Sequence, residues 1–162
     1  MRIATKSSKL NISKLENTKK IADIFAKNIF KGNVILFYGE IGVGKTTFIK
    51  FLVNSLEKID KKNISEITSP TFSLMNQYKL SKFDIHHYDL YRLKSEKDIL
   101  SLNIFEDISD KILLIEWPEI LGEHKPKNTI DINFEYGENF NSRYLTISAY
   151  EKLKIFDEFK SL

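Results

Sequence analysis

The 162-residue chain contains no cysteine, so disulfide bonds and thiolate-ligated zinc are both excluded. It also lacks any apolar run close to the length of a membrane span. Residues 1–17 carry scattered lysines but no apolar core, which argues against a signal peptide. Nothing points to an oxidising compartment, and we therefore expect a cytoplasmic protein with no membrane partner.

The composition fits one soluble globular unit. Hydrophobic residues make up 42% of the chain and charged residues 29%, and we expect residues 1–162 to form a single domain. The net charge of +3 hides an excess of basic residues over 1–62 and of acidic residues over 63–162. A basic surface for RNA or an acidic partner is one explanation. We favour lysines on the solvent faces of helices, because lysines without interleaved aromatic residues are weak evidence for nucleic-acid binding, and we expect no DNA partner.

The most informative motif is GEIGVGKTT, which matches the phosphate-binding loop pattern G-x-x-x-x-G-K-[ST]. An unbroken apolar run, Val34–Tyr38, precedes it as a buried strand would, and apolar residues at helical spacing follow it. Lys45 is expected to reach the β/γ-phosphates, and the Thr46 hydroxyl to ligate Mg²⁺. The loop residues expected to contact a nucleoside triphosphate are Gly39, Glu40, Ile41, Gly42, Val43, Gly44, Lys45, Thr46 and Thr47.

Two carboxylates stand at the ends of predicted strands. Glu116 follows the apolar run Ile112–Ile115 and is the expected holder of Mg²⁺ or of its water, although Asp is the usual residue there. The alternative is an ordinary strand that ends in a surface acid. Asp89 ends another strand, at the sheet edge where ligands gather in open α/β folds. It is the candidate for binding a metal-bound water or for orienting the attacking water.

The residues next to Asp89 carry further polar chemistry. His86 and His87 are adjacent, and neighbours on a strand point to opposite faces, so they are not expected to chelate one ion. We expect one to be exposed and the other to be hydrogen-bonded inside. Arg92 has two equally good interpretations, a phosphate contact or an ion pair with Asp89 or another acid.

The segment Ser69-Pro70-Thr71-Phe72 lies between the loop's helix and the next strand. In triphosphatases this position often carries a mobile segment whose threonine senses the γ-phosphate and Mg²⁺, and Thr71 is the candidate. The alternative is an ordinary strand entry that contains proline.

The order of elements predicts an α/β domain with the P-loop NTPase fold. We expect a mixed sheet with parallel central strands, antiparallel additions and helices on both faces. Strands are expected at 34–38, 72–80, 83–90, 111–115, 129–135 and 143–149, with a short edge strand within 1–6. Helices are expected from Ser13 to Gly32, after Thr47, at 95–102 and at 151–160. Ser13 is expected to form a capping box with Glu16, Leu15 to face the core, and Ser95 to cap its helix.

Four motifs, GEIGVGKTT, SPTF, HHYDLYRL and IEWPE, resemble in order and spacing the TsaE (YjeE) family of bacterial ATPases. The resemblance runs from Ser13 to Arg143. It implies functional roles for Lys45 and Thr46 of the phosphate loop, the acids Asp89 and Glu116, Trp117 beside the nucleotide, and Thr71 of the mobile segment. Arg143 is also assigned to nucleotide binding. Glu40 departs from the family's usual Asp, and Asn103 from its usual Gly, although Asn tolerates the left-handed backbone of a turn.

The family is required for threonylcarbamoyladenosine formation in tRNA, next to the anticodon. The resemblance implies that the chain binds ATP and Mg²⁺ and supports turnover of a TsaD–TsaB heterodimer, so that it meets tRNA indirectly. Two alternatives stay open, a small-molecule kinase and a stand-alone nucleotide-dependent switch. The first usually carries an arginine-bearing lid, but arginine occurs only at positions 2, 92 and 143. A GTPase switch would need the guanine-reading motif Asn-Lys-x-Asp, which is absent.

Overall fold

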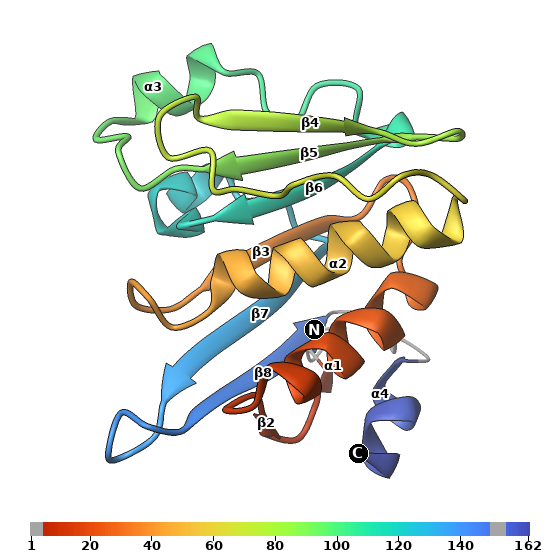
Figure 1. Ribbon diagram of the computed structural model, residues 1–162. Helices are drawn as coiled ribbons and strands as arrows, with labels where there is room; N and C mark the ends of the chain where they lie inside the picture. Colours follow the sequence, from red (N-terminus) through yellow and green to blue (C-terminus); the bar gives the residue numbers. More distant parts are fainter. Residues whose placement is uncertain (1–4, 150–154) are drawn as a thin grey trace.

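The computed structural model describes residues 5–149 and 155–162, which form one mixed sheet covered by helices (Figure 1). The strands run in the order β1-β8-β7-β3-β6-β5-β4, and β2 also pairs with β8. The parallel strands are β3 (Val34–Tyr38), β5 (Asp84–Asp89), β6 (Lys111–Glu116) and β7 (Thr129–Tyr136). The antiparallel additions are β1 (Thr5–Lys6), β2 (Leu10–Asn11), β4 (Met75–Lys79) and β8 (Arg143–Ala149). The predicted mixed sheet is confirmed.

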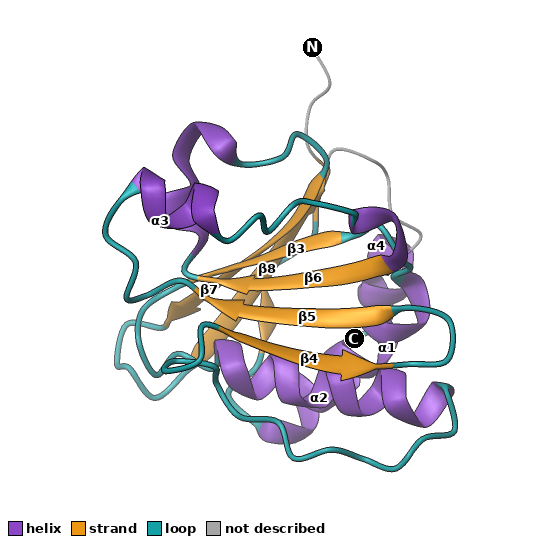
Figure 2. Cartoon of the chain, turned by 90° about the horizontal axis from the view of Figure 1, so that it is seen from above, coloured by secondary structure: helices purple, strands orange, loops and turns teal. Residues whose placement is uncertain are grey.

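Helices cover both faces of this sheet, as predicted (Figure 2). One face packs against α1 (Leu15–Asn28), α2 (Lys45–Ile59), α4 (Ile155–Glu158) and the 3-10 turn η3 (Phe159–Ser161). The other face packs against α3 (Glu96–Ser101) and the 3-10 segments η1 (Ile108–Asp110) and η2 (Pro118–His124). Strand β6 shows why the central strands are apolar throughout. Leu114 belongs to the first core, which packs against α1 and α2, and Leu113 belongs to the second core, which packs against α3. Successive side chains of the strand point to these opposite faces.

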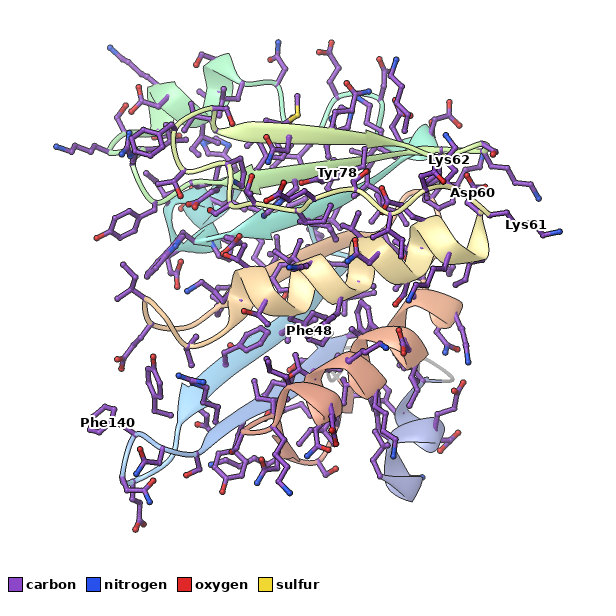
Figure 3. The ribbon with its side chains drawn as sticks, in the orientation of Figure 1. Phe48, Asp60, Lys61, Lys62, Tyr78 and Phe140 are labelled. Atoms are coloured by element: carbon purple, nitrogen blue, oxygen red, sulfur yellow. The ribbon has the colours of Figure 1, made fainter. Side chains whose placement is uncertain are left out.

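Helix α2 is fixed at both ends, and this sets the position of the loop before it (Figure 3). Near its start, the fully buried Phe48 ring packs edge-on against Phe134 of β7, with the ring centroids 5.9 Å apart. Just beyond its end, Asp60 Oδ2 accepts hydrogen bonds from the backbone N–H and the hydroxyl of Ser81. Lys62 Nζ donates to the backbone carbonyl of Lys79 at 2.7 Å. These contacts tie the helix to the turn between β4 and β5.

The predicted start of the first helix is wrong. Helix α1 begins at Leu15, with Lys14 at the N-cap position and no side-chain cap. Ser13 does not form a capping box, because its Oγ accepts a hydrogen bond from the backbone N–H of Arg143 at 2.9 Å. Leu15, expected in the core, is 64% exposed, and the helix ends at Asn28 rather than at Gly32. A contact with β8 has replaced the local one.

Two further predictions can be compared with the structure. The strand expected from Phe72 begins only at Met75, because the Leu74 N–H bonds the Pro70 carbonyl at 2.8 Å and closes a turn. The cap at Ser95 is confirmed, and Ser95 and Asp98 form a reciprocal capping box.

The last predicted helix includes residues 151–154, which lie outside the described part of the chain. Within the described ranges, no helix has the length and apolar character needed to cross a membrane.

Candidate functional site

Most of the predicted site residues line one cleft at the carboxyl ends of the parallel strands. In Figure 1 the arrowheads of β5, β6 and β7 end beside the loop that leads into α2. The cleft has a volume of about 310 Å³. Its lining residues are Ile41, Gly42, Gly44, Lys45, Thr46, Thr47, Ser69, Thr71, Asp89, Tyr91, Glu116 and Trp117. Of the predicted set, Gly39, Glu40, Val43 and Arg143 do not line it. Segments far apart in sequence therefore share one cavity.

The loop between β3 and α2 has a backbone that requires glycine. A Cβ on Gly39 would lie 2.8 Å from the carbonyl oxygen of Phe134, and the residue has φ 139°. Gly44, with φ 118°, is the N-cap of α2. The loop therefore passes into the amino end of a 15-residue helix, where free N–H groups and the helix dipole favour an anion. This geometry suits a phosphate group.

The Lys45 side chain folds back over this loop. Its Nζ donates to the carbonyl oxygens of Gly39 at 2.6 Å and Glu40 at 2.9 Å. Burial lowers the pKa of Lys45, and the nearby carboxylates of Glu116, Glu119 and Asp89 act in the opposite direction. The amine is thus partly desolvated, and three acids lie near enough to influence its charge.

Glu116 receives hydrogen bonds from two other elements. The Thr46 hydroxyl lies 3.1 Å from Oε1 and 3.0 Å from Oε2 of Glu116. His87 Nε2 lies 2.8 Å from Oε1, and both the His87 and Glu116 side chains are buried. A hydroxyl beside a carboxylate is the hard oxygen donor set that Mg²⁺ prefers, so Thr46 and Glu116 fit this ion. Among the described residues no three His, Asp or Glu side chains converge as a metal site. Mg²⁺ would therefore need nucleotide or water oxygens as well.

Asp89 is bound to the segment that precedes β4. Its Oδ2 accepts from Ser69 Oγ at 2.7 Å and from Thr71 Oγ1 at 3.2 Å, and its Oδ1 accepts from the Tyr91 N–H at 3.1 Å. The two hydroxyls are also 2.9 Å apart. Sequence motifs that were recognised separately thus form one hydrogen-bonded group. Movement of the segment Ser69–Phe72 would therefore change the hydrogen bonds of the Asp89 carboxylate.

Trp117 lies between the second core and the cleft. It packs against the buried cluster on the α3 side of the sheet and also lines the cavity. Its backbone has φ 57°, a left-handed conformation that is rare for an aromatic residue and that turns the chain sharply after Glu116. Its ring contacts Tyr91, with centroids 4.8 Å apart. The indole is thereby held at the edge of the cleft.

The described arginines lie outside the cavity lining. The Arg92 guanidinium lies 4.1 Å from the centroid of the exposed Phe72 ring. Among the described residues Arg92 forms no ion pair with Asp89 or with any other acid, so the acid-pairing interpretation is wrong. A cation over an aromatic face explains its position instead. Arg2 lies outside the described residues.

Arg143 lies on β8. In the sheet, β8 is separated from β3, the strand before the loop, by β7. Its guanidinium lies 5.6 Å from the ring centroid of Tyr136, and its Nε is buried without a hydrogen-bond partner. The Tyr136 hydroxyl in turn donates to the Ile41 carbonyl of the loop at 3.3 Å. In the part of the chain that the structure describes, Arg143 is thus linked to the loop through Tyr136.

Sequence reasoning assigned no role to Ser69 or Tyr91, and it did not find the pairing of His87 with Glu116. Alternation along β5 places His87 on the same face as Asp89, which was the available signal. The partner of His87 could be found only with the register of β5 against β6, because the two residues are 29 positions apart.

Comparisons with known proteins agree on one family. The family model described as "Threonylcarbamoyl adenosine biosynthesis protein TsaE" matches residues 12–145. The tRNA threonylcarbamoyladenosine biosynthesis protein TsaE of Rickettsia conorii is 37% identical over 137 residues, which cover 85% of this chain and 75% of that protein. The protein of the same name from a Nostoc species is 34% identical over 149 residues, with coverages of 88% and 86%.

The structural comparison concerns the fold. YdiB from Bacillus subtilis, a solved structure, superposes with a TM-score of 0.73 at 23% identity, covering 99% of this chain and 97% of that one. The sheet order, the glycine-dependent loop and the helix that follows it are those of a P-loop NTPase. With a family model that spans most of its length, this chain belongs to the TsaE family.

Proposed function

We propose that this protein, as a single domain, is a Mg²⁺-dependent ATPase that acts in the formation of threonylcarbamoyladenosine in tRNA. Membership of the TsaE family supports the pathway. The observation that carries the nucleotide chemistry is the pair of hydrogen bonds from Thr46 to both oxygens of Glu116. They join the phosphate-loop helix to the end of β6, as a site for a metal-bound triphosphate requires. Because the relatives named for tRNA threonylcarbamoyladenosine biosynthesis are bacterial, we also propose that the protein acts in the cytoplasm.

The site residues have distinct roles in this proposal. The loop N–H groups and the Lys45 ammonium bind the phosphates, and Thr46 and Glu116 hold Mg²⁺. When bound, Mg²⁺ would supply positive charge that stabilises the triphosphate. Asp89 orients the attacking water, and Thr71, hydrogen-bonded to it, transmits the position of the segment before β4. Trp117 borders the nucleotide, and Arg143 acts on the loop through Tyr136.

We further propose that a TsaD–TsaB heterodimer is the partner and that tRNA is met through it. The supporting feature is Phe72, whose side chain is 86% exposed, next to Thr71 on the segment that bonds Asp89. A partner that covers Phe72 would therefore act on the acid that orients water. The cleft itself is lined by one cation, Lys45, among the described residues, so added charge from a partner would help the transition state.

The decisive experiment measures nucleotide binding and product formation separately. Calorimetry with Mg²⁺ should show one nucleotide-binding site. ATP should bind this site more tightly than GTP in a competition titration. Addition of the protein to a TsaD–TsaB pair, with tRNA and threonylcarbamoyl-adenylate, should increase the number of modified tRNAs per heterodimer. Phosphate transfer from ATP to a small acceptor, with no effect on tRNA modification, would instead establish the kinase alternative.

A further inference from the structure

His87 is a fully buried histidine beside the candidate magnesium site. Its side chain has 0% exposure, and its Nε2 lies 2.8 Å from Glu116 Oε1. In the parallel register of β5 and β6, Asp89 pairs with Glu116 and His87 pairs with Leu114. All four side chains therefore point to the face that α2 covers. The imidazole contacts the Glu116 carboxylate but does not itself line the cleft.

The hydrogen-bonding pattern of the ring favours one tautomer. The second ring nitrogen, Nδ1, is buried and has no hydrogen-bond partner. A neutral imidazole has one N–H donor and one acceptor nitrogen. A proton on Nε2 gives the Glu116 carboxylate a donor and leaves Nδ1 as an unused acceptor. A proton on Nδ1 would instead bury an unpaired donor and set a lone pair against the carboxylate, which is unfavourable. The structure therefore supports an Nε2–H donor directed at Glu116.

His87 has no contact of its own with the cleft. The cavity lining includes Glu116 and Thr46 but not His87, so the ring can influence a bound group only through Glu116. The carboxylate is held from two sides, by Thr46 of α2 and by His87 of β5. The neighbouring His86 provides the contrast, because it points to the opposite face and its Nε2 is buried without a partner.

We propose that His87 is a positioning residue that fixes the Glu116 carboxylate in the orientation needed to hold Mg²⁺ beside the nucleotide. This inference rests on the proposed function and assigns one more residue to the same site. A donor behind a metal-binding carboxylate typically accounts for about 10–100-fold in metal affinity. The role predicts a specific loss. Nucleotide binding that depends on Mg²⁺ falls, while binding without Mg²⁺ is preserved.

The experiment measures ADP affinity by calorimetry with Mg²⁺ and with EDTA. The readout is the dissociation constant in EDTA divided by the dissociation constant in Mg²⁺. His87→Phe keeps a ring but removes the donor, and should reduce the ratio about tenfold. His87→Gln places an amide N–H₂ close to the position of Nε2 and should keep the ratio. His87→Asn is also polar, but its amide is too short to reach Glu116 and should behave like His87→Phe. His86→Phe is the matched control on the other face and should leave the ratio unchanged.

The outcomes separate the two proposals. An unchanged ratio in both His87→Phe and His87→Asn, with wild-type binding clearly Mg²⁺-dependent, overturns the positioning role and leaves the ATPase proposal intact. Equal losses with Mg²⁺ and with EDTA, together with a lower melting temperature, show a purely structural histidine and also overturn it. No ADP binding by the wild-type protein overturns the proposed function and this inference with it. If His87→Phe does not fold, His87→Gln and His87→Asn are compared instead. A lower ratio in the Asn variant supports the positioning role, and equal ratios overturn it.

Discussion

The Lys45 ammonium lies over the ring of Trp117, with Nζ 3.9 Å from the ring centroid. Lys45 follows β3 and Trp117 follows β6, and these two strands are parallel neighbours, so both residues emerge at the same edge of the sheet. The contact has the geometry of a cation–π interaction. Tyr91 packs against the same indole, which keeps it from turning away. The environment of the indole is therefore coupled to the lysine that is proposed to bind phosphate.

The first prediction uses this contact as a reporter. Trp117 is the only tryptophan, so its emission is not mixed with that of another indole. Binding of ATP or ADP should change the emission, because phosphate draws the Lys45 ammonium away from the ring. Lys45→Met, which keeps the length but not the charge, should shift the emission of the free protein. A flat titration, at nucleotide concentrations that calorimetry shows to be saturating, would contradict this interpretation.

The second prediction concerns the loop contacts. Lys45→Ala removes the cation directed at the β/γ-phosphates, and Thr46→Ala removes a Mg²⁺ ligand. A hydrogen bond to a charged group contributes about 2–3 kcal/mol, so ATP affinity in Mg²⁺ should fall at least about tenfold in each variant. Lys50→Ala, an exposed lysine on the same helix, is the control and should bind normally. Unchanged affinity in both test variants would contradict the assignment of the loop.

The third prediction separates the two acids. Asp89→Asn keeps the shape that Ser69 and Thr71 bind but weakens the group that orients water, so Mg·ATP should still bind while single-turnover hydrolysis is lost. Glu116→Gln removes charge from the proposed Mg²⁺ site, so the Mg²⁺ dependence of binding should fall. Rapid-quench hydrolysis and calorimetry on the same preparations measure both. If Asp89→Asn lost binding and kept hydrolysis, the two roles would have to be exchanged.

Local patterns predicted the elements that local forces determine. The apolar run Val34–Tyr38 has the bounds of β3, because both faces of that strand are buried and glycines lie close to its two ends. The turn after Ser101 contains Asn103 with φ 46°, the left-handed backbone that Asn was expected to tolerate. The cap at Ser95 needs a partner only three residues away. In these cases the sequence window contains all the interacting groups.

The start of the first helix and the position of Arg92 could not be predicted, because the contacts that decide them join residues distant in sequence. The Ser13 hydroxyl bonds Arg143, which is 130 positions away, and no helix-capping rule includes this competitor. The preference of Arg92 for the face of Phe72 over the Asp89 carboxylate depends on where the turn at Leu74 places that ring. The site residues were recognised as separate motifs, whereas their hydrogen bonds depend on the register between strands.

The fourth prediction is that the isolated protein hydrolyses ATP slowly and that a TsaD–TsaB heterodimer accelerates it. Efficient triphosphatases place a cation on the transition state, and an arginine finger contributes roughly 10³–10⁵ in rate. Here the Arg92 guanidinium is stacked on Phe72, and Arg143 is over Tyr136, so neither lines the cleft. The partner would have to complete the charge or reshape the segment that bonds Asp89.

Variants of that segment test the route of stimulation. Thr71→Ala removes one of the hydrogen bonds to Asp89 and should reduce the stimulated rate more than it reduces nucleotide affinity. Phe72→Ala removes an exposed ring from the proposed contact and should reduce stimulation without changing the basal rate. The matched control is Phe30→Ala, an aromatic that is 62% exposed and lies before β3, at the opposite end of that strand from the phosphate loop. Equal effects of Phe72→Ala and Phe30→Ala would place the contact elsewhere. A fast basal rate that the heterodimer does not change would show a site complete by itself, and would favour the kinase or the stand-alone switch.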